Sequence, residues 1–238
     1  MSSFGYFLLI MILLKQIIKL FVLISSFLKA EIDLQKLRYI KKQISNHVGV
    51  YRLKNEYYMN KFPDLNNTVL ITASNFGYLN HLLNFNCYMQ KLNFKFSVFS
   101  LDTTLHSFLR ENHPSINSIA FFDNSVSLSQ ASNFRTKFFN LITNKKEEAV
   151  FILLHLGFNV IFIDIDIALL KDPLIHLMLP RVDYVHTVNI RCSKSNRFDY
   201  SDSNLEGNTG LYYVKSTINT ISLWRKALIK AKKYINFN

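Results

Sequence analysis

The chain has 238 residues, enough for one sizeable globular domain with an appendage but too few for two ordinary domains. Hydrophobic residues make up 49% of the chain, which argues against an intrinsically disordered protein. The formal net charge is +12, but Lys and Arg are spread along the chain without a dense basic run beside aromatic residues, so an anionic small ligand is expected and no nucleic acid.

The first thirty residues predict a targeting segment. Residues 4–28 are almost entirely apolar and long enough to span a bilayer, but Lys15 and Lys19 interrupt them. These lysines can also be the positive flank of a short apolar core at Leu20–Leu28, as in a signal peptide or an uncleaved signal anchor. Both interpretations attach the chain to the secretory membrane system, and a buried N-terminal hydrophobic helix is the alternative.

Residues 31–64 are polar and charged and predict a stem or linker. A partial helical stripe begins within it, at Leu34, Leu37 and Ile40. The sequence therefore predicts three parts. They are the targeting segment at 1–30, the stem at 31–64 and a folded domain at 65–238.

Strands and helices alternate from residue 68 onward. Short apolar or β-branched runs predict strands at 68–72, 94–101, 116–122 and 160–167. Helical spacing of apolar residues predicts helices at 78–91 and 147–156, the second ended by Gly157. Cys87 lies on the first helix, where a buried thiol is expected. This order predicts an α/β fold, with a mainly parallel sheet and helices on both faces.

An acidic pair, Asp164 and Asp166, closes the most apolar of these strands. Side chains alternate along a strand, so an isoleucine at every second position of 161–167 forms one face and both carboxylates project from the other. Ligands of such sheets bind beyond this carboxyl end. Two neighbouring carboxylates there favour the binding of a divalent cation, since Mg²⁺ is typically held by one or two carboxylates together with substrate phosphates. The alternative is a pair that caps the next helix or is bridged to Lys171 and Arg181.

The run from Leu156 to Asp166, continuing to Pro173-Leu174, resembles the signature of the nucleotide-diphospho-sugar transferase family. This family includes the plant-type xylosyl- and arabinosyltransferases of glycosyltransferase family 77. Its signature is a helix ending in Leu-x-Gly-Tyr, a strand bearing Asp-x-Asp and a later Pro-Leu. Three further stretches resemble family motifs in the same order: Thr72–Phe85, Phe99–Asp102 and Leu205–Val214.

The resemblance implies a GT-A fold, which is Rossmann-like, and sugar transfer from a nucleotide-diphosphate donor such as a UDP-sugar. It further implies a glycan or glycoprotein acceptor, retention of the anomeric configuration, and a Golgi membrane protein of type II orientation with a lumenal domain. Asp166 would hold Mn²⁺ or Mg²⁺ on the diphosphate, and Asp164 would contact the metal or the ribose. The cation would offset the charge that develops on the departing nucleotide diphosphate.

The same resemblance assigns further site residues. Four would line the nucleotide pocket: Thr72, Ala73, Ser74 and Asn75. Asp102 would lie in the same pocket, and Lys146 would meet the diphosphate, unless it is a solvated lysine at a helix start. Asn208 and Thr209 would approach the donor sugar or the acceptor and join the two aspartates in catalysis, unless they only form a turn before Gly210.

Family members continue past the position of Asn238 with an Asp-Gln motif and a late His, so 65–238 is expected to be incomplete at its C-terminal end. The alternative function is therefore a catalytically inactive, membrane-associated nucleotide-sugar-binding protein. A haloacid dehalogenase-type phosphatase also carries Asp-x-Asp at a strand end, but here the pair comes late, and Ala168 stands where Thr or Val is usual. A basic nucleic-acid binder is a further alternative that no motif supports.

Overall fold

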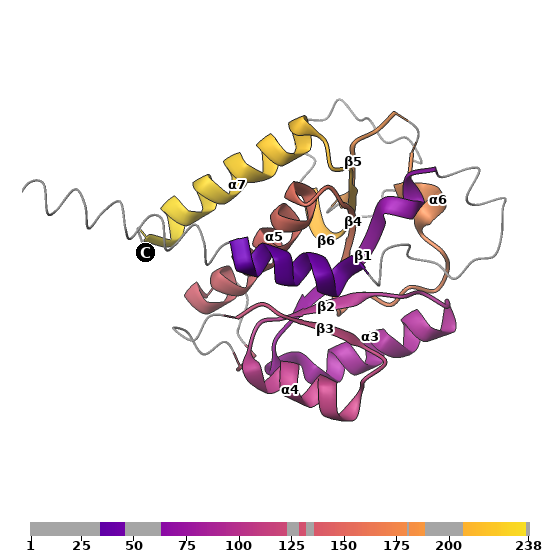
Figure 1. Ribbon diagram of the computed structural model, residues 1–238, viewed down its shortest axis with the longest axis vertical. Coiled ribbons are helices and arrows are strands. Elements are labelled where there is room, and N and C mark those ends of the chain that lie inside the picture. Colours follow the sequence, from indigo (N-terminus) through magenta and orange to yellow (C-terminus); the bar gives the residue numbers. More distant parts are fainter. Residues whose placement is uncertain are drawn as a thin grey trace, which may run out of the picture. The chain divides into compact units, whose positions relative to one another are not determined.

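The computed structural model in Figure 1 describes residues 34–45, 63–122, 129–131, 136–179, 181–188 and 207–236. The chain divides into two compact units, Met1–Lys42 and Gln43–Asn238. The expected helical stripe of the stem is a helix over 34–45. The predicted targeting segment, with its hydrophobic helix, lies outside the described residues. Among the residues that are described, no helix is both long and apolar enough to cross a membrane.

In the described part of the second unit, six strands form one sheet in the order β3-β2-β1-β4-β6-β5. The strands are β1 (Thr68–Ser74), β2 (Ser97–Ser100), β3 (Asn117–Ala120), β4 (Asn159–Ile163), β5 (Tyr184–Val188) and β6 (Gly207–Val214). The pairs β1–β2, β2–β3 and β1–β4 are parallel, whereas β6 runs antiparallel to both β4 and β5. The predicted α/β fold with a mainly parallel sheet is confirmed.

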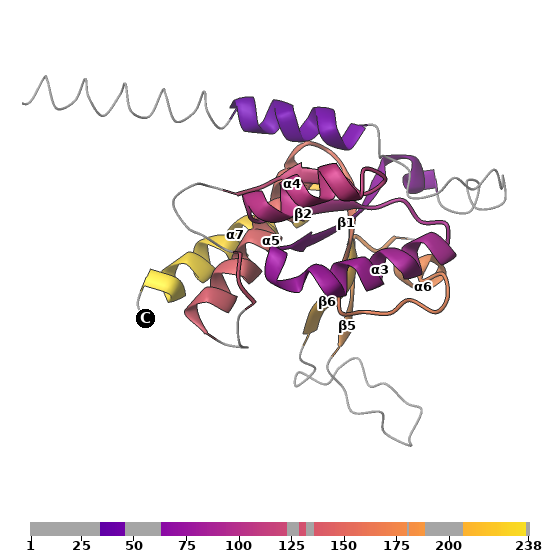
Figure 2. The ribbon, with the colours of Figure 1, turned by 90° about the horizontal axis from the view of Figure 1, so that it is seen from below.

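Helices cover both faces of this sheet (Figures 1 and 2). They are α3 (Leu79–Lys91), α4 (Thr103–Asn112), α5 (Lys137–His155), α6 (Leu174–Leu177) and α7 (Ile218–Asn236), with short 3-10 helices η1 (Pro63–Asn67) and η2 (Phe76–Tyr78). Apolar side chains of α3, α4 and α6 form one core cluster with Leu70, Val98 and Ile161 of the sheet. On the other face α5 contacts β1 and β4, and α7 packs on α5. Every residue of β1 and β4 is therefore buried.

Helix α5 begins at Lys137, well before the predicted start at Glu147. The hydroxyl of Thr136 accepts a hydrogen bond from the amide of Phe139 at 3.1 Å and caps the helix there. Gly157 ends the helix as predicted, because its φ of 89° is one that glycine adopts without strain. The early start places Lys146 in the middle of the helix instead of at its beginning.

Strand β4 ends at Ile163, four residues before the predicted end at Ile167. The amide of Ile167 donates to the carbonyl of Asp164 at 3.1 Å, which closes a turn directly after the strand. The prediction that the strand alternation continues through Asp166 is therefore wrong. The acidic pair lies at the beginning of this turn.

Two other differences from the predictions, at α4 and at Cys87, arise because the side chains concerned face solvent. Helix α4 was not predicted, because its sequence is largely polar and only Leu105 and Leu109 are fully buried. Helix α3 buries Leu82, Phe85 and Met89, which leaves Cys87 on the solvent side. The expectation of a buried Cys87 thiol is wrong, since this thiol is exposed.

A close main-chain contact fixes the loop that follows β1. The amide side chain of Asn75 donates to the carbonyl of Gln130 at 2.8 Å. At Gly77 an added Cβ would lie 2.6 Å from the carbonyl carbon of Gln130 and 2.9 Å from the Cα of Ala131. Only glycine fits this approach, so residues 129–131 pack directly on the loop.

Gly77→Ala should lower the free energy of unfolding by about 1–3 kcal/mol, because the methyl group overpacks a contact between two main chains. Urea denaturation measures the change, and Asn80→Ala, at an exposed position of α3, is the matched control. Equal unfolding midpoints for the two variants would show that 129–131 does not pack on Gly77.

Candidate functional site

The carboxyl ends of β1, β2 and β4 lie at one edge of the sheet, because these strands are parallel. Strand β6 begins at the same edge, since it runs antiparallel to β4. Ile163 pairs with Leu211, and the amide of Asp164 donates to the carbonyl of Gly210 at 2.7 Å. The β1–β4 pairing continues as far as Ile71 beside Phe162, so the end of β1 lies next to the end of β4. The edge thus brings together segments that are far apart in the sequence.

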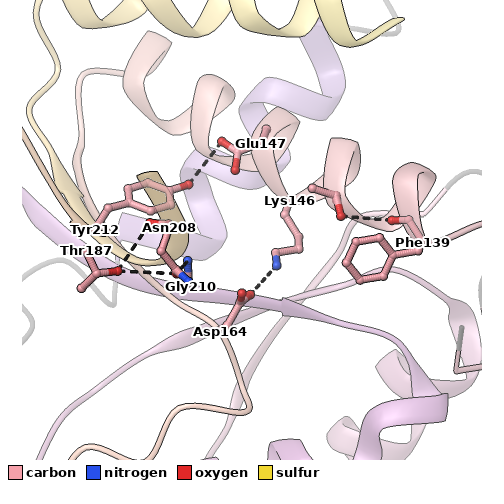
Figure 3. Close-up of polar contacts among 9 residues, drawn as sticks. Phe139, Lys146, Glu147, Asp164, Thr187, Asn208, Gly210 and Tyr212 are labelled. Carbon is pink, nitrogen blue, oxygen red and sulfur yellow. Dashed lines mark hydrogen bonds and ion pairs between the residues drawn. The ribbon is translucent and has the colours of Figure 1, made fainter. Parts of the chain in front are cut away.

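Asp164 forms an ion pair with Lys146 of α5 (Figure 3). Both side chains are largely shielded from solvent, with 14% of Lys146 and 27% of Asp164 exposed. The Lys146 ammonium also lies 5.2 Å from the centroid of the Phe162 ring. Burial raises the pKa of Asp164, the Lys146 charge opposes this rise, and the Asp166 carboxylate adds to it. The alternative of a solvated lysine is wrong for Lys146.

The structure shows which side chain pairs with Asp164 of the acidic pair. Asp164 is paired, but with Lys146 instead of Lys171 or Arg181. Asp172 begins α6, since its carboxylate accepts a hydrogen bond at 2.8 Å from the first amide of that helix. Neither alternative of the sequence analysis therefore describes Asp164.

Asp166 lies exposed in the turn after β4. Within the described ranges, no group of three or more His, Cys, Asp or Glu side chains could hold a metal ion. Asp164 and Asp166 offer carboxylate oxygens, the ligands that Mg²⁺ prefers, and such a site usually takes its other ligands from water and substrate phosphates. The donor set therefore fits a cation shared with a bound phosphate.

The start of β6 packs tightly against Asp164. The side-chain oxygen of Asn208 accepts a hydrogen bond from the amide of Gly210 at 2.7 Å. A Cβ at Gly210 would lie 2.9 Å from this oxygen and 3.4 Å from Oδ2 of Asp164. Thr209 is exposed, at a point where the pairing of β6 with β5 is irregular. The structure brings Asn208 close to Asp164.

The predicted nucleotide-lining residues occupy the end of β1 and the position after it, and all are buried: Thr72, Ala73, Ser74 and Asn75. The Thr72 hydroxyl has no hydrogen-bond partner among the residues that the structure describes. The Ser74 hydroxyl donates to the carbonyl of Asn75 at 3.1 Å. These residues lie at the predicted edge, next to β4, but beneath the surface.

Asp102 follows β2 and holds two loops together. One carboxylate oxygen accepts from the amide of Leu105 at 2.8 Å and caps α4, and the other accepts from the amide of Phe76 at 2.7 Å. Only 6% of Asp102 is exposed. Its contacts are structural ones, and a contact with the donor remains a prediction.

Glu147 is a residue of this region that the sequence analysis missed. Trp224 of α7 donates its indole N–H to the Glu147 carboxylate at 2.9 Å, and the Tyr212 hydroxyl donates to it at 3.3 Å. Part of the residue is exposed, but its carboxyl group is buried, and this burial raises the pKa of Glu147 against the opposing effects of Lys146, Trp224 and Tyr212. Burial also raises the pKa of Tyr184 to about 12.

A family model for nucleotide-diphospho-sugar transferases matches residues 92–237, which is more than half of the chain. The chain belongs to the nucleotide-diphospho-sugar transferase family. No curated protein matches it closely enough to count as a relative. The range that matches the family includes Lys146, the acidic pair and Asn208, and it begins after β1. Family membership supports a transferase with a nucleotide-sugar donor, and it leaves the phosphatase alternative without support.

Glu147→Gln should change how stability depends on pH. Because burial raises the folded-state pKa of Glu147 above its ordinary value of 4.5, the stability from this group is present below that value and is lost as the pH rises through the folded-state pKa. The glutamine cannot ionise, so the free energy of unfolding of the variant should rise relative to that of the wild type as the pH is raised from 4.5 through the folded-state pKa.

Urea denaturation across that pH range measures this difference. Glu111→Gln, at an exposed glutamate of α4, controls for the added amide. A difference between Glu147→Gln and the wild type that does not change with pH would contradict the expected titration.

Proposed function

We propose that the chain binds a nucleotide-diphosphate sugar, such as a UDP-sugar, at the carboxyl edge of the sheet and transfers the sugar to a glycan or glycoprotein with retention of configuration. The observation that supports this most is the placement of Lys146 on Asp164 directly after β4, with Asp166 in the following turn. A positive group and two carboxylates at a strand end suit a phosphate and its cation. The likeness to glycosyltransferase family 77 is part of the same proposal.

Asp166, with Asp164 beside it, would hold Mn²⁺ or Mg²⁺ on the diphosphate. When bound, the cation offsets the negative charge that develops on the departing nucleotide diphosphate. Lys146 would bind a phosphate oxygen, because an ammonium has three N–H donors and the ion pair with Asp164 does not exhaust them. Because Lys146 contacts Asp164, the lysine and a cation held by the acidic pair would act on the same diphosphate.

The end of β1 would receive the nucleotide. The buried Thr72 hydroxyl supports this, since a polar atom without a partner in the described residues is costly to leave unpaired. Asn208 would approach the donor sugar from β6, with Thr209 near the acceptor. Asp102 would contact the donor while its carboxylate keeps the hydrogen bonds to the amides of Leu105 and Phe76.

Residues 1–30 carry the proposals about location. Their apolar sequence supports a membrane-attached protein of the secretory pathway. The Golgi and a type II orientation are proposed from the family resemblance. A catalytically inactive nucleotide-sugar-binding protein is the alternative function. Release of sugar from a UDP-sugar in the presence of Mn²⁺ would decide for the enzyme, and donor binding without such release would decide for the alternative.

Isothermal titration of UDP into the full chain in detergent, with and without Mn²⁺, tests the donor site. Binding should require Mn²⁺ and should weaken at least about tenfold in Asp166→Ala, because the variant removes the most accessible carboxylate of the cation site. Glu111→Ala, which removes an exposed carboxylate on α4, should bind UDP like the wild type. Equal affinity with and without Mn²⁺ would contradict the proposed role of the cation.

Lys146→Met should weaken UDP binding about 10- to 100-fold, because a hydrogen bond to a charged group contributes about 1.5–3 kcal/mol. Uridine, which has no phosphate, should bind the variant and the wild type alike. Lys145→Met is the matched control, since the adjacent Lys145 pairs with Glu148 at 2.9 Å. Equal losses for UDP and uridine would show that Lys146 does not bind the diphosphate.

A further inference from the structure

Glu147 follows Lys146 on α5, yet the two side chains reach different partners (Figure 3). Lys146 pairs with Asp164 after β4, whereas Glu147 accepts hydrogen bonds from Tyr212 of β6 and Trp224 of α7. Two successive residues of a helix point about 100° apart. A fixed direction for one of them therefore sets the direction of the other.

The partners of Glu147 are themselves firmly packed. Tyr212 is fully buried and stacks on Phe162, with ring centroids 5.2 Å apart and 18° between the ring planes. Trp224 packs edge-on against Tyr184 at 5.1 Å and lies 5.8 Å from the Tyr212 ring. One carboxylate thus joins α5 to a strand and to α7 through groups that have little room to move.

These partners also lie close to the donor site. Tyr212 pairs with Phe162 in the β4–β6 register. Phe162 comes two residues before Asp164, and Tyr212 comes two residues after Gly210, whose carbonyl accepts from the Asp164 amide. The Phe162 ring contacts groups that belong to both interactions, since it stacks on Tyr212 and lies 5.2 Å from the Lys146 ammonium. A rotation of α5 that broke the Glu147 contacts would also carry Lys146 away from Asp164.

We propose that Glu147 is a positioning residue of the donor site, which holds α5 in the rotation that places Lys146 on Asp164. This inference rests on the proposed donor function. A buried carboxylate is costly, and an apolar side chain of similar size would pack α5 equally well. The carboxylate adds directional specificity that apolar packing does not provide, because its two hydrogen bonds form in only one rotation of the helix. Through Trp224 it also makes the lysine's position depend on α7.

A double-mutant cycle on UDP affinity in the presence of Mn²⁺ tests this proposal. Glu147→Leu removes both hydrogen bonds at similar volume and should weaken UDP binding about tenfold, an effect within the range measured for coupled neighbours. In a Lys146→Met background the same substitution should change UDP affinity less than about twofold, because the lysine that it positions is absent. Glu147→Gln, which retains an acceptor for the indole, should recover part of the affinity.

The outcomes separate this proposal from the proposed function. No UDP binding by the folded wild type would overturn both. Wild-type binding that Lys146→Met weakens, with equal losses from Glu147→Leu in both backgrounds, would keep the donor site and overturn the positioning role. If Glu147→Leu does not fold, Trp224→Phe takes its place in the cycle, since it removes the indole donor and keeps an aromatic ring. The same non-additivity is then expected, and additive losses would again overturn the positioning role.

Discussion

A carboxylate that follows a fully buried strand needs a compensating charge, and the site depends on how Asp164 obtains one. Every residue of β4 is buried, so Asp164, which directly follows this strand, lies at the margin of the apolar core. Leaving a charge unpaired there is strongly unfavourable. Helix α5 supplies Lys146 at this point, and the same helix packs on β4 and β1. The same contact orders the strand end, the helix and the start of β6.

The sequence predicted those elements whose burial shows in the order of residues. Strand β1 and helix α3 lie close to their predicted bounds, because the β-branched run ends near Asn75 and apolar spacing continues to Lys91. Strand β5 was missed because its residues are only partly buried and form no apolar run. The early start of α5 depends on the cap at Thr136, a single hydroxyl that a pattern of apolar residues does not reveal.

The site was predictable where its residues are neighbours in sequence. Asp164 and Asp166 stand out because they directly follow an apolar strand. Glu147 does not stand out, because Tyr212 is 65 residues away and Trp224 is 77 residues away. The pairing of Lys146 with Asp164 depends likewise on the way in which α5 folds back on β4. Spacing can identify the acidic residues that follow a strand, but the partners that orient them come from the tertiary fold.

The antiparallel course of β6 has a consequence for the time at which the site forms. The first residues of β6 contact Asp164. The site around Asp164 therefore cannot form until the ribosome has released β6, which is synthesised well after the acidic pair. Pairings between distant segments close slowly, because the chain loses loop entropy before it gains contacts. Until then, the edge of β4 that β6 will cover is open to other chains. Assembly of this protein should therefore be most vulnerable to aggregation in the interval between synthesis of β4 and of β6.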